Sequence, residues 1–188
     1  MPGSNSNKAR IYFCVYFQQG PTGTNGNPRV FHCGLWVEDK NSRGGGHYFH
    51  VQYHPPYSNR PNEPSGWLYD SSVARSRVAN WKQSSQLIGR ILLGKLAAGV
   101  TAQHVHQVCS TVTLPRGNED CWDWTGRAIG AIQDQRWLAA HRWSGRDGLR
   151  ASAYSRACAW WEKDRQRLPS KVHYWDIYGT ESAHCVVM

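Results

Sequence analysis

One cysteine and two histidines are the residues of this chain best placed to carry out covalent chemistry. Cys121 comes directly after the run NED and before the apolar run WDWTGRAIGAI, so either Asn118 or Asp120 can cap a helix that begins at the cysteine. A thiol in the first turn of a helix faces unpaired backbone N–H groups and the positive end of the helix dipole, which lower its pKa. His32 and His50 occupy segments with strand-like alternation. These residues predict a thiol nucleophile activated by an imidazole base.

The strands VFHCGLWVE and HYFHVQY must bring the histidines to the thiol. The intervening turn DKNSRGGG predicts an antiparallel hairpin, and a turn centred near Asn41 puts His32 directly opposite His50. A shifted register would put Gln52 or His54 there instead. We therefore predict His32 as the base and His50 as the residue that orients it, with Gln52 as the alternative. The backbone N–H of the nucleophile is the expected oxyanion donor.

The remaining segments predict an α+β fold in which a small antiparallel sheet packs against the helix that bears the nucleophile. The inner face of that helix is expected to carry Cys121, Trp124, Ala128, Ile132 and Gln135. We expect a flexible tail over 1–10, one catalytic domain over 11–180 and a C-terminal tail over 181–188. The further strands are expected at 11–17, 67–69, 87–96 and 172–178, and the helices at 101–110, 121–140 and 148–167.

The order of these motifs resembles that of the circularly permuted papain-like families, which include the lecithin:retinol acyltransferase-like and NlpC-like thiol enzymes. The motifs are HCGLWV, then FHV after a turn, then DCWDW at a helix start, and the resemblance covers about residues 30–132. It implies a permuted papain-like fold, with Cys121 as nucleophile, His32 as base and His50 as the orienting residue. The chain departs from the family pattern at Asp120, where Asn is frequent, and in a long Pro-rich segment over 55–85.

The charge of the chain favours an anionic partner. The chain has 22 Lys and Arg against 13 Asp and Glu, which gives a net charge of +9, although solubility alone also explains such an excess. Between residues 136 and 171 arginines alternate with tryptophans, a combination that binds phosphates and stacks on planar groups. The candidate residues for binding RNA or another anionic substrate are Arg136, Arg142, Arg146, Arg150, Arg156, Arg165, Arg167, Trp143 and Trp160.

Three functions are compatible with these features. In size and charge alone, the chain resembles the fungal arginine-containing cyclodipeptide synthases, which implies tRNA as the acyl carrier and assigns no site residue. The first function is therefore acyl transfer from an aminoacyl or peptidyl ester carried on RNA. The second is a thiol hydrolase or acyltransferase that acts on peptide, isopeptide or phospholipid. The third is a non-enzymatic RNA-binding module in which Cys121 is structural. The charge ranks the first ahead of the second.

The ends of the chain and its remaining histidines bear on location and cofactors. MPGSNSNKAR lacks the apolar core of a signal peptide and no stretch is apolar enough to span a bilayer, so we expect a cytoplasmic protein with reduced thiols. Several histidines are candidate metal ligands. Spacings of three and four within 47–54 suit one face of a helix, but that segment is an expected strand, and the two histidines within 101–110 lie on different faces of the expected helix, so we expect no metal or other cofactor. These histidines are His47, His50, His54, His104 and His106.

The ending Cys185-Val186-Val187-Met188 matches a prenylation motif, although a chance ending is an equal alternative. Because no basic cluster precedes Cys185, a single prenyl group would give only weak peripheral association with membranes. No protein partner is predicted.

Overall fold

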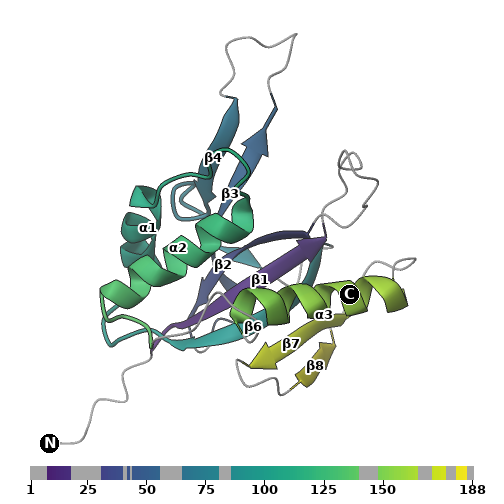
Figure 1. Cartoon of the computed structure of the whole chain (residues 1–188). Helices are drawn as coiled ribbons and strands as arrows, with labels where there is room; N and C mark the ends of the chain where they lie inside the picture. Colours follow the sequence, from purple (N-terminus) through teal and green to yellow (C-terminus); the bar gives the residue numbers. More distant parts are fainter. Residues whose placement is uncertain are drawn as a thin grey trace, which may run out of the picture.

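A single eight-stranded sheet runs through the computed structural model (Figure 1). Along the sheet the strands follow the order β4-β3-β2-β1-β6-β7-β8, and β5 pairs with β3. The structure describes residues 8–17, 31–39, 42, 44–55, 65–80, 86–139, 148–164, 171–176 and 181–185, with backbone only from residue 160 onward. The strands are β1 (Arg10–Phe17), β2 (Phe31–Glu38), β3 (Gly45–His54), β4 (Gly66–Ser71), β5 (Ala79–Asn80), β6 (Leu87–Lys95), β7 (Lys171–Asp176) and β8 (Glu181–Cys185).

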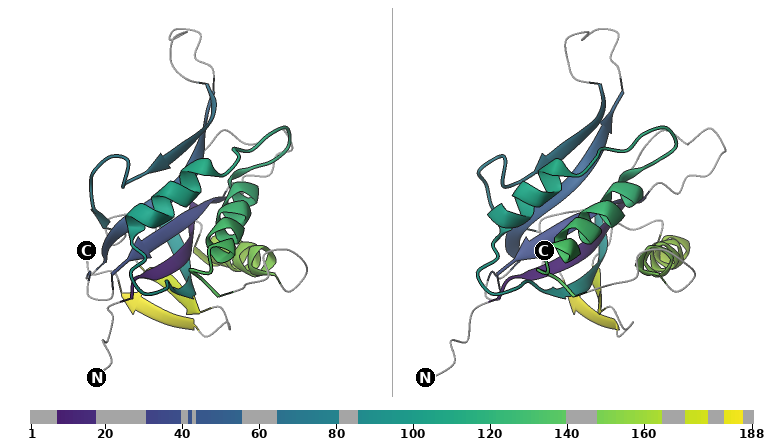
Figure 2. Two further views of the ribbon diagram at one scale, coloured as in Figure 1. Left: turned by 90° about the vertical axis from the view of Figure 1, so that its left-hand side faces the viewer. Right: turned by 60° about the vertical axis from the view of Figure 1, so that its left-hand side comes forward.

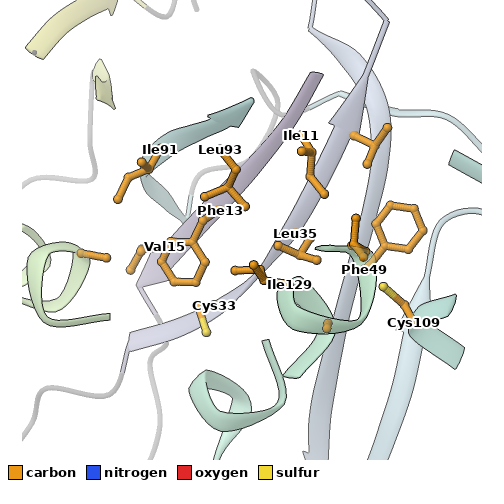
Figure 3. Packing of buried hydrophobic residues seen from close by; sticks show 14 of the residues in the cluster. Ile11, Phe13, Val15, Cys33, Leu35, Phe49, Ile91, Leu93, Cys109 and Ile129 are labelled. Carbon is orange, nitrogen blue, oxygen red and sulfur yellow. The ribbon is translucent and has the colours of Figure 1, made fainter. Parts of the chain in front are cut away.

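The helices α1 (Ala102–Thr111), α2 (Cys121–Asp134) and α3 (Leu149–Asp164) all contribute side chains to one core with the sheet. In the two views of Figure 2, α1 and α2 lie along the same side of the sheet. Figure 3 shows the inward-facing side chains of the strands, among them Phe13 and Leu35, close to Ile129 of α2. This packing fixes the position of α2, and therefore of its first residue, relative to β2 and β3.

Alternation along β2 gives the sheet two different faces. Cys33, Leu35 and Val37 point into the helix-covered core, whereas Trp36 packs with side chains of β1 and β6 on the other face. On that second face Glu38 accepts hydrogen bonds from Tyr12 at 2.8 Å and from Arg90 at 3.1 Å. Among the described residues no helix is long and apolar enough to cross a membrane.

The predicted α+β class is confirmed, and the helix at 101–110 and the strands at 11–17 and 87–96 appear within one or two residues of their expected bounds. The sheet is not wholly antiparallel, because β7 runs parallel to β6. The three helices lie between β6 and β7 in the sequence, and they supply the long crossover connection that a parallel pair of strands needs. Residues 181–185, which we assigned to a tail, form β8 and pair with β7.

The helix that begins at Cys121 ends at Asp134 and not near residue 140. Arg136 has a positive φ of 59°, a left-handed conformation that ends the helical turn. Gln135 is therefore the C-cap and is exposed, so its expected place on the inner face is wrong. The other four predicted inner-face residues of α2 are all buried: Cys121, Trp124, Ala128 and Ile132.

Candidate active site

Cys121 is the first residue of α2, and Asp120 is the N-cap that fixes this position. The Asp120 carboxylate accepts hydrogen bonds from the backbone N–H groups of Trp122 at 2.8 Å and Asp123 at 3.2 Å. In return, the Asp123 carboxylate accepts from the backbone N–H of Asp120 at 2.9 Å, which completes a capping box. The sequence left Asn118 and Asp120 as alternative caps, and the structure has Asp120. The Cys121 side chain remains only 6% exposed.

Two side chains of β2 act on the Cys121 sulfur. Its pKa lies well below the usual value for a thiol because the Cys33 side chain hydrogen-bonds the sulfur, and this effect together with a hydrogen bond and the charge of His32 outweighs burial. Burial raises the pKa of Cys33 well above its usual range, so Cys33 keeps its proton. Thr125 holds this arrangement together, since its hydroxyl lies 3.5 Å from the Cys33 sulfur and donates to the Cys121 carbonyl at 2.8 Å. Sequence reasoning missed Cys33 because it treated the residue as core packing.

His32 and His50 meet as expected, but through a different register. Nε2 of His32 lies 2.6 Å from Nδ1 of His50. The pairs Leu35↔Phe49 and Val37↔His47 show that the turn is centred one residue later than predicted, so Gly34 lies opposite His50 and the two histidines are diagonal neighbours. The expectation that they are directly opposite is therefore wrong. Their rings still meet because a Cβ on residue 34 would lie only 2.8 Å from the His50 Cβ, and glycine leaves that space empty.

Asp70 on β4 extends the pair to a third strand, and sequence reasoning did not identify it. Asp70 pairs with His50 in the ladder between β3 and β4, and its Oδ2 lies 3.4 Å from His50 Nε2. Arg75 donates to both carboxylate oxygens, from Nε to Oδ1 at 2.9 Å and from Nη2 to Oδ2 at 2.6 Å. Burial alone would raise the pKa of Asp70, but the hydrogen bond from His50 and the charge of Arg75 bring it below its usual value. Our predicted strand at 67–69 ended one residue too early to reveal this acid.

The alternative orienting residue, Gln52, is exposed and pairs with Leu68 on β4. It lines the same cleft as the histidines, yet in the described part of the chain His32 has its imidazole contact with His50 instead. Of these two candidates, His50 is the one in contact with His32.

The predicted RNA-binding residues are only partly described. Arg136 is exposed just beyond α2, and Arg156 is half-buried on α3. The Arg150 guanidinium pairs with Asp123 and lies 3.7 Å from Asp120, which ties α3 to the first turn of α2. Cys185 is the last residue of β8, and its side chain lies outside the described part. The remaining candidates also lie outside the described residues: Arg142, Trp143, Arg146, Arg165, Arg167 and the side chain of Trp160.

A cleft of about 830 Å³ contains the candidate nucleophile and both histidines. Cys121, His32, His50 and Asp70 all line it, so a bound molecule can reach the thiol in spite of its low exposure. Most of its other lining is aromatic, with the two aromatic side chains Tyr53 and Trp67 in contact at 5.6 Å between ring centroids on the β3–β4 hairpin. This hairpin projects from the body of the molecule in Figure 1. The remaining aromatic residues of the lining are Tyr16, Phe17, Phe31, Tyr48, Phe49 and Trp122.

Three of the other histidines make side-chain hydrogen bonds of their own. His106 lies 3.0 Å from the Tyr69 hydroxyl and 3.1 Å from that of Ser71, His104 caps α1 through Thr101, and His47 lies 3.2 Å from Ser72. Within the described ranges no group of three or more His, Cys, Asp or Glu side chains is arranged to hold a metal ion. The five cysteines whose side chains are described are free thiols: Cys14, Cys33, Cys109, Cys121 and Cys158.

Comparisons of the chain with protein-family models, with curated proteins and with solved structures gave no match. Any functional conclusion therefore has to come from the geometry and chemistry of the chain itself.

Replacing Cys33 with alanine is expected to slow the alkylation of Cys121 at pH 6 several-fold. The substitution removes the first of the hydrogen bonds that lower the thiol pKa, so a smaller fraction of Cys121 is thiolate at that pH. At alkaline pH the Cys121 thiol is fully ionised in both proteins, so their alkylation rates should converge. Iodoacetamide labelling followed by peptide mapping measures the rate at each pH. Cys109→Ala is the control, because that buried thiol has its pKa raised to about 12 and lies on α1. Identical pH profiles for Cys33→Ala and the unmodified chain would contradict the role given to Cys33.

Proposed function

We propose that this protein is a cysteine-dependent acyl-transfer enzyme in which Cys121 forms a thioester with the acyl group of its substrate. The observation that carries the proposal is the position of Cys121, which is the first residue of α2 and lines one cleft together with His32, His50 and Asp70. The effects of Cys33 and His32 on this thiol lower its pKa. Most buried cysteines have raised pKa values, as Cys14 and Cys109 do here, at about 12 each. A thiolate beside an imidazole in a cleft is the arrangement that nucleophilic catalysis requires.

The reaction has two halves. His32 takes the proton of the Cys121 thiol, and the thiolate attacks the substrate carbonyl carbon. The backbone N–H of Cys121, at the N-terminus of α2, is an expected donor to the oxyanion that forms. Collapse of this intermediate breaks the bond to the leaving group, which takes the proton from His32. An amine, a hydroxyl or water then gives its proton to His32 and attacks the thioester, and the thiolate is released.

The resemblance to the permuted papain-like enzymes supports the same assignment. The strand histidine, the polar residue on the neighbouring strand and the helix cysteine follow one another in the family's order as His32, His50 and Cys121. A sheet packed against the helix that bears the cysteine agrees with this fold as well. The capping role of Asp120 explains how the chain does without the more frequent Asn, because a carboxylate also caps a helix.

An RNA-borne acyl donor is a second, narrower form of the proposal, and the net charge of +9 is what favours it. In this form RNA should co-purify with the protein and its binding should weaken steeply with salt. Arg156, which is half-buried on α3, is a described residue at which this role can be tested. Ester hydrolysis that needs no RNA would instead favour a thiol hydrolase or acyltransferase acting on peptide, isopeptide or phospholipid.

Thioester trapping tests the common core of these forms. The full chain is mixed with a panel of labelled donors, namely an activated ester, a peptide ester, a phospholipid and an aminoacyl-tRNA, and is quenched in acid. We expect one acyl group per chain, located on the peptide that contains Cys121. Hydroxylamine should release it, because thioesters are cleaved by that reagent. Cys121→Ala should take up no label and Cys109→Ala should take up as much as the unmodified chain. Equal labelling of the Cys121→Ala variant would contradict the proposal.

A further inference from the structure

Four polar side chains form a continuous line that begins at the thiol and ends at the surface. His32 comes from β2, His50 from β3 and Asp70 from β4, and Arg75 follows in the turn after β4. The links after the thiol measure 2.6 Å between the imidazoles, 3.4 Å from His50 to Asp70 and 2.6 Å from Asp70 to Arg75. His50 and Asp70 are 14% and 16% exposed, whereas Arg75 is 55% exposed. The line therefore connects an enclosed nucleophile with a solvated cation.

We infer that Asp70 is a positioning residue, which fixes the ring protons of His50 and His32 and thereby makes His32 a base toward the thiol. This inference rests on the proposed function and adds to it a residue that the papain-like resemblance did not supply. Each step follows from which atoms are able to donate a hydrogen bond and which are able only to accept one.

The first step is the His50 ring. An ionised carboxylate only accepts hydrogen bonds, so we assign the ring proton of His50 to Nε2, the atom that lies 3.4 Å from Asp70 Oδ2. Burial lowers the pKa of His50 in spite of the opposing effect of Asp70, so the ring is neutral at neutral pH and holds a single proton. With that proton on Nε2, Nδ1 of His50 is an acceptor.

The second step is the His32 ring. Its Nε2 lies 2.6 Å from the bare Nδ1 of His50, so His32 must be the donor in this contact. A neutral His32 then has no proton left for its own Nδ1, the nitrogen that remains for the thiol. The lone pair on Nδ1 is what allows His32 to accept the proton from Cys121. If the proton of His50 moved to Nδ1, both rings would reverse and His32 would face the thiol with an N–H group.

Arg75 keeps Asp70 in its accepting state. Its two hydrogen bonds occupy both carboxylate oxygens in a bidentate pair, and its charge favours the ionised acid. When the thiol ionises, the S–H bond breaks and an N–H bond forms at His32 Nδ1. His32 can then pass its Nε2 proton to His50 Nδ1, which places the positive charge beside the Asp70 carboxylate. Among the described residues, the other titratable groups that face the two rings or line the cleft beside them are Tyr16 of β1, Tyr48, Tyr53 and His54 of β3 and, next to the nucleophile, Asp120.

The test measures ring protons directly. Histidine labelled with nitrogen-15 is introduced into the full chain carrying Cys121→Ala, and the nitrogen shifts of His32 and His50 are compared with and without Asp70→Asn. We expect protonated Nε2 and bare Nδ1 atoms in both rings when Asp70 is present. Asparagine has nearly the same shape but can donate from its amide, so Asp70→Asn should give a measurable population with protonated Nδ1 atoms. In the chain that retains Cys121, Asp70→Asn should slow alkylation and turnover by about 10²-fold, less than the loss known for a direct partner of a catalytic histidine.

Arg75→Gln provides a milder variant that leaves Asp70 in place, and Arg77→Gln is its matched control, since Arg77 is an exposed arginine two residues away. We expect a several-fold loss of Cys121 reactivity for Arg75→Gln and none for Arg77→Gln. Unchanged ring protons in Asp70→Asn, or equal effects of the two arginine variants, would overturn the inference even where Cys121 proves to be the nucleophile. The ring protons are measured in the Cys121→Ala chain. Their positions can therefore be determined even if Cys121 proves not to be a nucleophile.

Discussion

Replacing Cys121 with alanine is expected to lower turnover by about 10⁴-fold or more, because no other described thiol shares its position and pKa. The fold should survive. The side chain contributes one sulfur at the rim of the core, and the capping bonds of α2 come from Asp120 and Asp123, which remain. A loss of about 1 kcal/mol of stability is the expected scale for such a substitution. Turnover of an activated ester, together with thermal unfolding followed by circular dichroism, measures both effects.

His32→Gln provides the internal check on this result. A nucleophile and its base act as a unit, so removing either should cost nearly as much as removing both. The double variant Cys121→Ala/His32→Gln is therefore expected to be no slower than Cys121→Ala alone. Losses that multiply in the double variant would show that the two residues act independently, and full turnover in Cys121→Ala would remove the nucleophile assignment. Cys109→Ala, which deletes a buried sulfur on α1, should keep full turnover.

The start of α2 and the strands β1, β2, β3 and β6 could be predicted because local rules determine them. The NED run before an apolar helical pattern marks a helix start, and the structure uses Asp120 for it. The alternation in HCGLWV separates His32 and Trp36 from the core-facing Cys33, Leu35 and Val37, as found. These signals each lie within about ten residues, so no tertiary contact had to be known in advance.

The features that escaped prediction all depend on distant contacts. The β2–β3 register differs from the predicted one because the turn is centred one residue later, and a turn rich in glycine does not determine its own centre. Asp70 became part of the site only through the pairing of β4 with β3. The ion pair between Arg150 and Asp123 likewise depends on how α3 packs against the start of α2. A run of charges reveals its partners only when the tertiary structure is known.

Replacing Gly34 with alanine is expected to lower activity by about 10²-fold through displacement of His50, without touching any reacting group. A Cβ at this position would lie 2.7 Å from the Phe49 carbonyl oxygen and 2.8 Å from the His50 Cβ, both shorter than a van der Waals contact. Because one of these atoms belongs to the backbone, β2 and β3 must move apart. The 2.6 Å contact between the imidazoles should then lengthen, and stability should fall by about 1–3 kcal/mol, as overpacking typically costs.

Gly130→Ala separates this local clash from a general effect of adding a methyl group. Gly130 lies within α2, where an added Cβ meets nothing within 4 Å, so alanine should leave activity unchanged and raise stability by about 0.5–1 kcal/mol. The two variants make the same chemical change in one chain, and they differ only in what surrounds the new methyl group. Denaturant unfolding and ester turnover of both variants give the comparison. If Gly34→Ala behaved like Gly130→Ala, the close approach of β3 at Gly34 could not be what brings His50 to His32.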